Sequence, residues 1–263
     1  MTERPLVAFT LLTQMAVGAF LTLGALDAWA GGLTGQATAH ALTNGALLAI
    51  GPVVGAALLA SLFHLGSPRN AWRTLANLRS SWLSREILLA LLFAVLGGLF
   101  AVLRASGAGS PAFRARLAIA AAVAGVALVY AMARVYRLRT VRRWDTPLTA
   151  VSFFATALLL GSLGVGTGFV LLPDVPDALV VGPLHVIAVV AAGCFGAEVA
   201  AEGSGTLHGI RRLLLLLGIV LCVVLLLSAG RATALVVAAF LVALAAQVLG
   251  RYLFYVTGLQ RSL

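Results

Sequence analysis

Long apolar runs separated by short polar segments dominate the sequence. Eight runs approach the roughly 20 apolar residues that a helix needs to cross a bilayer. They cover residues 5–27, 41–63, 86–104, 116–136, 147–171, 179–200, 211–230 and 232–256. Alternating segments of about ten residues, which are typical of membrane β-barrels, are absent. The pattern therefore predicts an all-α, polytopic integral membrane protein: a bundle of eight transmembrane helices forming one domain over residues 1–263.

The composition agrees with a membrane protein. Hydrophobic residues make up 62% of the sequence and charged residues 10%, whereas soluble proteins average roughly 45–50% and about 25%. These values exclude an ordinary cytosolic enzyme, a disordered chain and a disulfide scaffold. Ala28-Trp29-Ala30 resembles a signal-peptidase site. The preceding apolar stretch is longer than that of a typical signal peptide, so we expect the first helix to be retained.

The basic residues are unevenly distributed. All 18 are arginine and, against eight acidic residues, they give a formal charge of +10. They lie between apolar runs, which favours orientation, lipid headgroup contact or partner docking over nucleic-acid binding. With eight spans, 14 of the 18 share the face that carries both termini. The positive-inside rule places this face in the cytoplasm, unless its charge serves to dock a soluble subunit. The docking candidates are Arg73, Arg79, Arg137, Arg139, Arg142 and Arg143.

The strongest polar cluster lies between the second and third runs. His64 ends the second run and Glu86 opens the third, so a hairpin returns both to one membrane face. A neutral histidine accepts protons near neutral pH, and a carboxylate is a second proton acceptor. The pair suits a molecule that releases two protons on oxidation. The alternative is structural: His64 caps a helix end, and Glu86 lies in a first helical turn beside Arg85.

Three further polar clusters lie near predicted helix ends. They are residues 134–147, Glu198 with Glu202, and Arg251 with Tyr252 and Tyr255. Interfacial anchoring explains most of them, with aromatic rings in the headgroup region and carboxylates snorkelling toward water. For the basic loop at 137–143, docking of an acidic partner is the alternative.

The sequence does not predict a metal centre or a haem. Cys194 and Cys222 form no CxxC pair and are expected to be buried thiols. A membrane haem needs two axial histidines on facing helices. Any such pair would include a histidine at or beyond a helix end; the four are His40, His64, His185 and His208.

In order along the sequence, the polar motifs resemble the DmsC-type membrane anchor subunit of dimethyl sulfoxide reductase and related molybdoenzymes. The most specific motif is His64-Leu65-Gly66-Ser67-Pro68 followed by Ser84-Arg85-Glu86-Ile87. Weaker matches are Arg134-Val135-Tyr136, Trp144 with Thr146-Pro147 and Phe153-Phe154, Gly196-Ala197-Glu198, and Gly250-Arg251 with Phe254-Tyr255. The arginine-dense loop at 137–143 and the short connection with Asp174 and Asp177 depart from the family pattern.

The resemblance implies a quinol-oxidising anchor in the bacterial cytoplasmic membrane that serves anaerobic respiration. It implies an iron–sulfur partner subunit, a molybdopterin catalytic subunit and no haem in this chain. It places menaquinol at His64, Ser67, Arg69 and Glu86, with His64 and Glu86 accepting its protons. The terminal reduction would occur in another protein, which leaves polysulfide or selenate as alternative acceptors. The rival from another class is a stand-alone transporter or lipid-binding membrane protein.

Overall fold

Each predicted apolar run forms one helix. The computed structural model describes residues 4–34, 36–62, 77–137, 144–171, 177–200, 205–230 and 232–259. Its helices are α1 (Arg4–Thr34), α2 (Gln36–Leu62), α4 (Trp82–Ala105), α5 (Pro111–Tyr136), α6 (Pro147–Leu171), α7 (Asp177–Ala200), α8 (Thr206–Leu226) and α9 (Thr233–Leu259). Within these residues, eight helices are long and apolar enough to cross a membrane. The predicted all-α, eight-helix membrane fold is confirmed.

Several helices begin earlier than the hydropathy pattern predicts, and α4 and α8 are two of them. Ser81 caps α4, where its side chain accepts a hydrogen bond from the Ser84 backbone N–H at 3.2 Å. Glu86 therefore lies beyond the first turn of α4. Helix α8 begins at Thr206 and ends at Leu226, whereas the predicted span was 211–230. The predicted run began at Arg211 because a charged residue was taken as the helix boundary. In the structure α8 begins five residues earlier, so Arg211 lies inside the helix.

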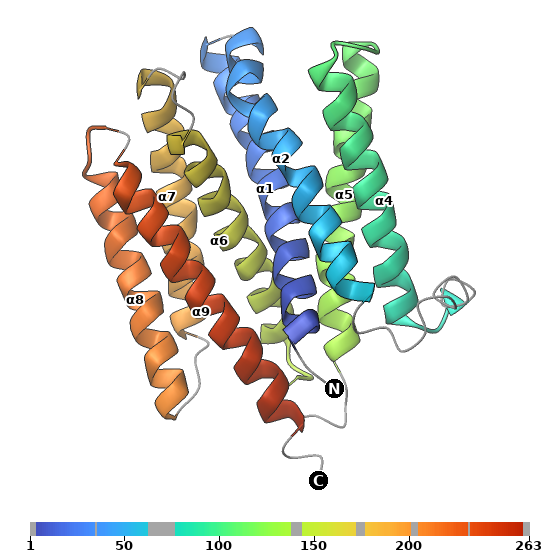
Figure 1. The fold of residues 1–263 in the computed structure, drawn as a ribbon, viewed down its shortest axis with the longest axis vertical. Coiled ribbons are helices and arrows are strands. Elements are labelled where there is room, and N and C mark those ends of the chain that lie inside the picture. The colour runs from blue at the N-terminus through green and yellow to red at the C-terminus, as the bar shows by residue number, and fades with distance from the viewer. Residues whose placement is uncertain are drawn as a thin grey trace.

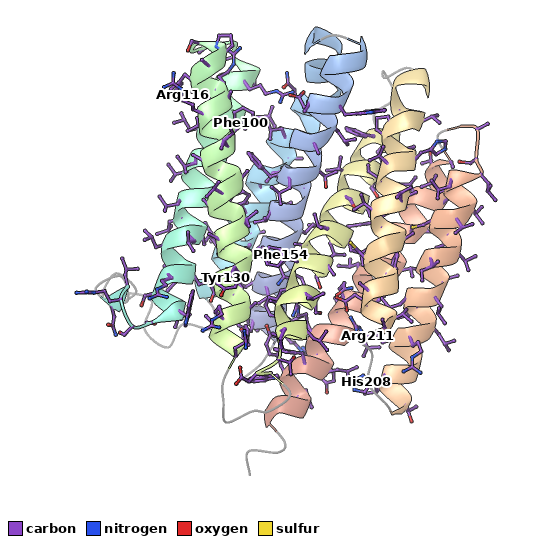
Figure 2. The ribbon with its side chains drawn as sticks, turned by 180° about the vertical axis from the view of Figure 1, so that it is seen from behind. Phe100, Arg116, Tyr130, Phe154, His208 and Arg211 are labelled. Atoms are coloured by element: carbon purple, nitrogen blue, oxygen red, sulfur yellow. The ribbon has the colours of Figure 1, made fainter. Side chains whose placement is uncertain are left out.

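The helices run alternately up and down, so the start of α1 and the end of α9 lie at one end of the bundle (Figure 1). We call this the terminal end, and the other the opposite end. Figure 2 shows His208 and Arg211 toward the terminal end and Phe100 and Arg116 toward the opposite end. The alternation agrees with the predicted topology that gathers most arginines on one face.

Helices α1 and α6 form the centre of the bundle. In both, 61% of the most apolar stretch is buried, against 17% in α2. A Cβ atom on Gly18 would lie 1.7 Å from the Ala157 carbonyl oxygen, and one on Gly161 would lie 2.2 Å from the Ala19 backbone nitrogen. Only glycine fits where the two backbones approach this closely, and small residues commonly allow such packing in membranes.

Candidate functional site

Three of the predicted site residues lie in the described part of the protein. Glu86 is in α4, Arg79 is exposed just before it, and Arg137 follows α5. Arg137 donates through Nε to Asp145 Oδ1 at 3.3 Å, with both side chains partly exposed. The others lie outside the described residues: His64, Ser67, Arg69, Arg73, Arg139, Arg142 and Arg143.

Glu86 is the most unusual of the predicted residues. It is 4% exposed, and none of the described residues forms a hydrogen bond or an ion pair with its carboxyl group. A buried carboxyl group without a partner is costly, and in a membrane helix such a group is by default a functional candidate. This is the same carboxyl group that the sequence pattern indicates as a proton acceptor.

Arg85, next to Glu86 in the sequence, has different partners. Its Nε donates to the Leu78 carbonyl at 2.8 Å and its Nη2 to the Arg79 carbonyl at 2.7 Å. Its guanidinium also lies 4.3 Å from the centroid of the Trp82 ring. The part of the structural alternative that puts Glu86 in the first turn of α4 is therefore wrong, whereas its other part, a helix cap by His64, lies outside the described residues. Arg85 ties the start of α4 to the preceding turn, and Glu86 points into the bundle.

A pair of tyrosines lies beside Glu86. The rings of Tyr136, at the end of α5, and Tyr255, in α9, have centroids 5.3 Å apart, and their hydroxyl groups are hydrogen-bonded. Tyr255 Oη also donates to Thr10 Oγ1 in α1 at 3.4 Å. Glu86 interacts electrostatically with both tyrosines. Hydroxyl groups from three helices, α1, α5 and α9, thus come together in this part of the bundle.

Aromatic rings pack around the tyrosine pair. Trp144 stacks on Phe254 with centroids 5.1 Å apart, and its Nε1 donates to the Phe254 carbonyl at 3.0 Å. Tyr136 contacts the edges of both rings and also packs against Phe153. These side chains come from α5, α6, α9 and the segment before α6. The predicted interfacial anchor is therefore a packed aromatic cluster at the terminal end.

Arg251 lies behind this cluster and is 3% exposed. Its guanidinium is 3.7 Å from the centroid of Phe153, and its Nη2 donates to Gln14 Oε1 at 2.9 Å and to Thr156 Oγ1 at 3.3 Å. Thr156 in turn donates to Gln247 Oε1 at 2.9 Å. Within the described residues, Arg251 Nε and the side-chain nitrogens of Gln14 and Gln247 have no hydrogen-bond partner. The network thus has unused donors, which water or a ligand can satisfy.

A buried ion pair joins α7 to α8. Arg211 Nη2 binds Glu198 Oε2, and Ser152 Oγ donates to Glu198 Oε1 at 3.0 Å. Arg211 Nε donates to the Ala246 carbonyl at 3.1 Å. A Cβ atom on Gly250 would lie 2.4 Å from Arg211 Nε, so the absence of a side chain there makes room for the guanidinium. Glu198 is 2% exposed, so the predicted snorkelling of this carboxylate is wrong.

Part of this network was not predicted from the sequence. Gln14, Thr156 and Gln247 were not selected, although amides inside apolar runs are a usable signal because polar groups are costly there. Arg251 and Tyr255 were grouped with Tyr252 as interfacial residues. In the structure Arg251 and Tyr255 face the bundle, whereas Tyr252 is 49% exposed. The spacing along α9 explains this difference. Arg251 and Tyr255 are four residues apart and therefore share the buried face, whereas Tyr252 lies on another face.

A further polar cluster, at the opposite end, was not predicted either. Arg104 contacts both carboxylate oxygens of Asp27, at 2.7 and 3.2 Å. Its Nε donates to Asn44 Oδ1 at 2.8 Å, and its Nη2 donates to Thr43 Oγ1. The pair joins α1, α2 and α4. The signals in the sequence were Asp27 and Asn44 within the first two apolar runs and Arg104 at the end of the third.

Comparison with known proteins decides the family. Residues 1–203 match the family model described as DMSO reductase anchor subunit (DmsC). The protein belongs to the DMSO reductase anchor subunit family. The resemblance predicted from the ordered motifs is confirmed. The match includes Glu86, Tyr136 and Glu198, whereas Arg211, Arg251 and Tyr255 lie beyond it.

Individual relatives include two dimethyl sulfoxide reductase chains and one sulfite dehydrogenase subunit. The C chain of the anaerobic dimethyl sulfoxide reductase of Escherichia coli is 34% identical over 162 residues, which cover 61% of this protein and 55% of that one. The equivalent C chain of Haemophilus influenzae is 30% identical, with 60% and 56% covered. The C subunit of the sulfite dehydrogenase of Allochromatium vinosum is 32% identical, with 47% and 41% covered. The match thus spans about half the length of the DMSO reductase relatives. No solved structure matches this protein.

Proposed function

We propose that this protein is the membrane anchor of a multisubunit molybdoenzyme reductase and oxidises menaquinol at the terminal end of the bundle. It would lie in the bacterial cytoplasmic membrane and take part in anaerobic respiration. Its partners would be an iron–sulfur electron-transfer subunit and a molybdopterin catalytic subunit. Membership of the DmsC family supports the anchor role. The observation that supports the site is the buried Glu86 carboxyl group, which none of the described residues engages.

The chemistry requires two proton acceptors and one electron acceptor. Oxidation of a quinol breaks two O–H bonds and yields a quinone, two protons and two electrons. His64 would accept a hydrogen bond from one hydroxyl group and then its proton. Glu86 would take the second proton and pass it out of the site. The electrons would leave singly to the iron–sulfur partner, so this protein would need no redox cofactor of its own.

The tyrosine pair fits a supporting role for Glu86. Tyr136 and Tyr255 lie within electrostatic reach of its carboxyl group and form a hydrogen-bonded pair with each other. Their hydroxyl groups would orient the carboxyl group and stabilise its changing charge. Tyr255 also reaches Thr10 in the central helix α1, which holds it in place. We assign the tyrosines to positioning, because they interact electrostatically with the acceptor.

The arginines of the terminal end fit the docking of the partner subunits. Arg79 is exposed and Arg137 is partly exposed in the described segments. Arg73, Arg139, Arg142 and Arg143 belong to the same proposed surface by their place in the sequence. Docking here would put the electron acceptor at the end that carries Glu86, which shortens electron transfer. Ser67 and Arg69 would contact the quinol head group, between the docking arginines and Glu86.

The test of the site uses membranes that carry the assembled complex. In His64→Ala and Glu86→Gln variants we expect quinol-driven reduction of the terminal acceptor to fall on the order of 100-fold, as for loss of a general base. Reduction driven by a viologen dye, which donates to the soluble subunits, is expected to stay unchanged and serves as the control. Unchanged quinol turnover and unchanged binding of a quinol analogue would refute the site.

Copurification tests the anchor role separately. We expect the affinity-tagged protein, extracted in mild detergent, to elute with two soluble subunits and with iron and molybdenum. Charge-reversal variants at Arg79 and Arg137 are expected to weaken this association, with Arg116 at the opposite end as the matched control. A protein that elutes alone and without these metals would instead support the stand-alone transporter or lipid-binding alternative.

A further inference from the structure

The glycines between α2 and α4 do not bring the two helices together. Gly51 and Gly55 of α2, and Gly97 and Gly98 of α4, line a cavity of about 350 Å³. A Cβ atom on Gly51, Gly55 or Gly98 would meet nothing within 4 Å, and one on Gly97 would meet only Phe20 at 3.8 Å. Glycines in membrane helices commonly permit close packing, as they do where α1 crosses α6. Here they keep a space open.

The cavity is a groove with a buried floor and an exposed rim. Phe20 and Phe93 line the floor. Their rings pack edge to face, with centroids 5.7 Å apart. Leu48 and Val102 lie on the rim and are 46% and 60% exposed. The groove therefore opens sideways, toward the hydrocarbon of the bilayer. Its volume lies in the range of small-molecule sites, roughly 300–1,000 Å³, and its lining suits a hydrocarbon tail.

The groove leads toward Glu86. A second space of about 10 Å³ is lined by Val54, Leu58 and Phe93, which also line the groove, and by Ala90. Ala90 lies four residues after Glu86 and therefore on the same face of α4. The two spaces adjoin, because Val54, Leu58 and Phe93 line both. Together they extend along α4 from Val102 to Ala90, one helical turn from the buried carboxyl group.

On the basis of the proposed function, we propose that this groove holds the isoprenoid tail of the quinol, with its head group beside Glu86. From Glu86 to Val102 helix α4 rises about 24 Å, which is long enough for several isoprene units. The methyl branches of the tail fit the spaces that Gly51 and Gly55 leave one turn apart. A phospholipid that enters from the terminal end fits less well, because its anionic phosphate would lie beside a buried carboxyl group.

Filling the groove tests the proposal in the assembled complex. Gly55→Leu and Gly97→Leu narrow it from opposite walls. Gly45→Leu is the matched control, because Gly45 lies in α2, is exposed and does not line the groove. For menaquinol with its full tail we expect kcat/KM to fall about tenfold in both groove variants, the loss from roughly two unburied methylene groups. For a tailless naphthoquinol we expect a change of less than about twofold on the same basis.

A binding readout separates this proposal from the proposed function. A menaquinone with a diazirine at the end of its tail is expected to label α2 and α4, to lose this label in Gly55→Leu and to keep it in Gly45→Leu. Labelling elsewhere, equal loss for both quinols, or equal labelling by a diazirine phospholipid that menaquinone does not displace would overturn the groove assignment. Labelling in the groove of a wild-type complex that oxidises no quinol would refute the proposed function alone.

Discussion

The polar cluster around Arg104 and the region around Glu86 and Arg251 treat buried charge differently, although the terminal end also holds the paired Arg211 and Glu198. At the opposite end, the Arg104 guanidinium forms two hydrogen bonds with the Asp27 carboxylate. Asn44 and Thr43 accept further hydrogen bonds from the same guanidinium. At the terminal end, the Glu86 carboxyl group has no hydrogen-bond or ion-pair partner among the described residues, and neither does Arg251 Nε. Both clusters join several helices. They differ in whether the protein itself completes the hydrogen bonding.

This difference separates assembly from chemistry. A paired and hydrogen-bonded charge fixes how helices pack and needs nothing more from its surroundings. A buried polar group without a partner destabilises the fold, and packing does not offset this cost. Such a group is expected where water or a ligand binds it or where it takes part in proton transfer. The contrast supports placing quinol chemistry at the terminal end and a structural role at the other.

Breaking the completed pair should have the largest effect on stability. Asp27→Ala leaves the Arg104 guanidinium buried without its carboxylate, so we expect the free energy of unfolding to fall by about 3 kcal/mol. Replacing both partners, with Asp27→Leu and Arg104→Met, should recover most of this loss. Denaturant titration in detergent micelles measures both. Glu86→Gln, which breaks no described contact, should change stability by less than about 1 kcal/mol, and an equal loss there would erase the contrast.

The fold was predictable because the hydropathy pattern alone fixes which segments can cross the membrane. Runs of about 20 apolar residues must be helical where no water satisfies the backbone, so the number and order of helices follow from the sequence. The exact boundaries do not follow. Arg211 lies inside α8 because Glu198 of α7 is there to pair with it, and no pattern within residues 206–226 reveals that partner. The α1–α6 crossing also depends on Gly18 and Gly161, which lie 143 positions apart in the sequence.

The glycines offer a second contrast between closed and open packing. Gly161→Ala would place a Cβ atom 2.2 Å from the backbone of α1, and we expect it to lower the free energy of unfolding by about 2 kcal/mol. Gly55→Ala meets nothing within 4 Å and should raise it by up to about 1 kcal/mol, because alanine favours the helix. Unfolding of the two variants side by side checks the sign. Loss of stability in both would mean that the groove closes in solution.

The site was predictable only in part. Glu86 was selected as a polar residue at a helix start, and that signal is local. Its surroundings are not local, because Tyr136 and Tyr255 come from helices 50 and 169 residues further along the sequence. Arg251 and Tyr252 are neighbours in the sequence yet face opposite ways. Which of them is buried depends on the rotation of α9, which packing against α6 and α8 decides.

The tyrosine pair provides the smallest and most discriminating effect. Tyr255→Phe keeps the ring packing but removes the hydroxyl group that links Tyr136 to Thr10. We expect quinol turnover to fall about fivefold, the equivalent of one hydrogen bond or about 1 kcal/mol. Tyr252→Phe is the control on the exposed face of the same helix and should leave turnover unchanged. If Tyr255→Phe also leaves turnover unchanged, the pair contributes packing alone. The functional contrast between the two ends would then rest on Glu86 itself.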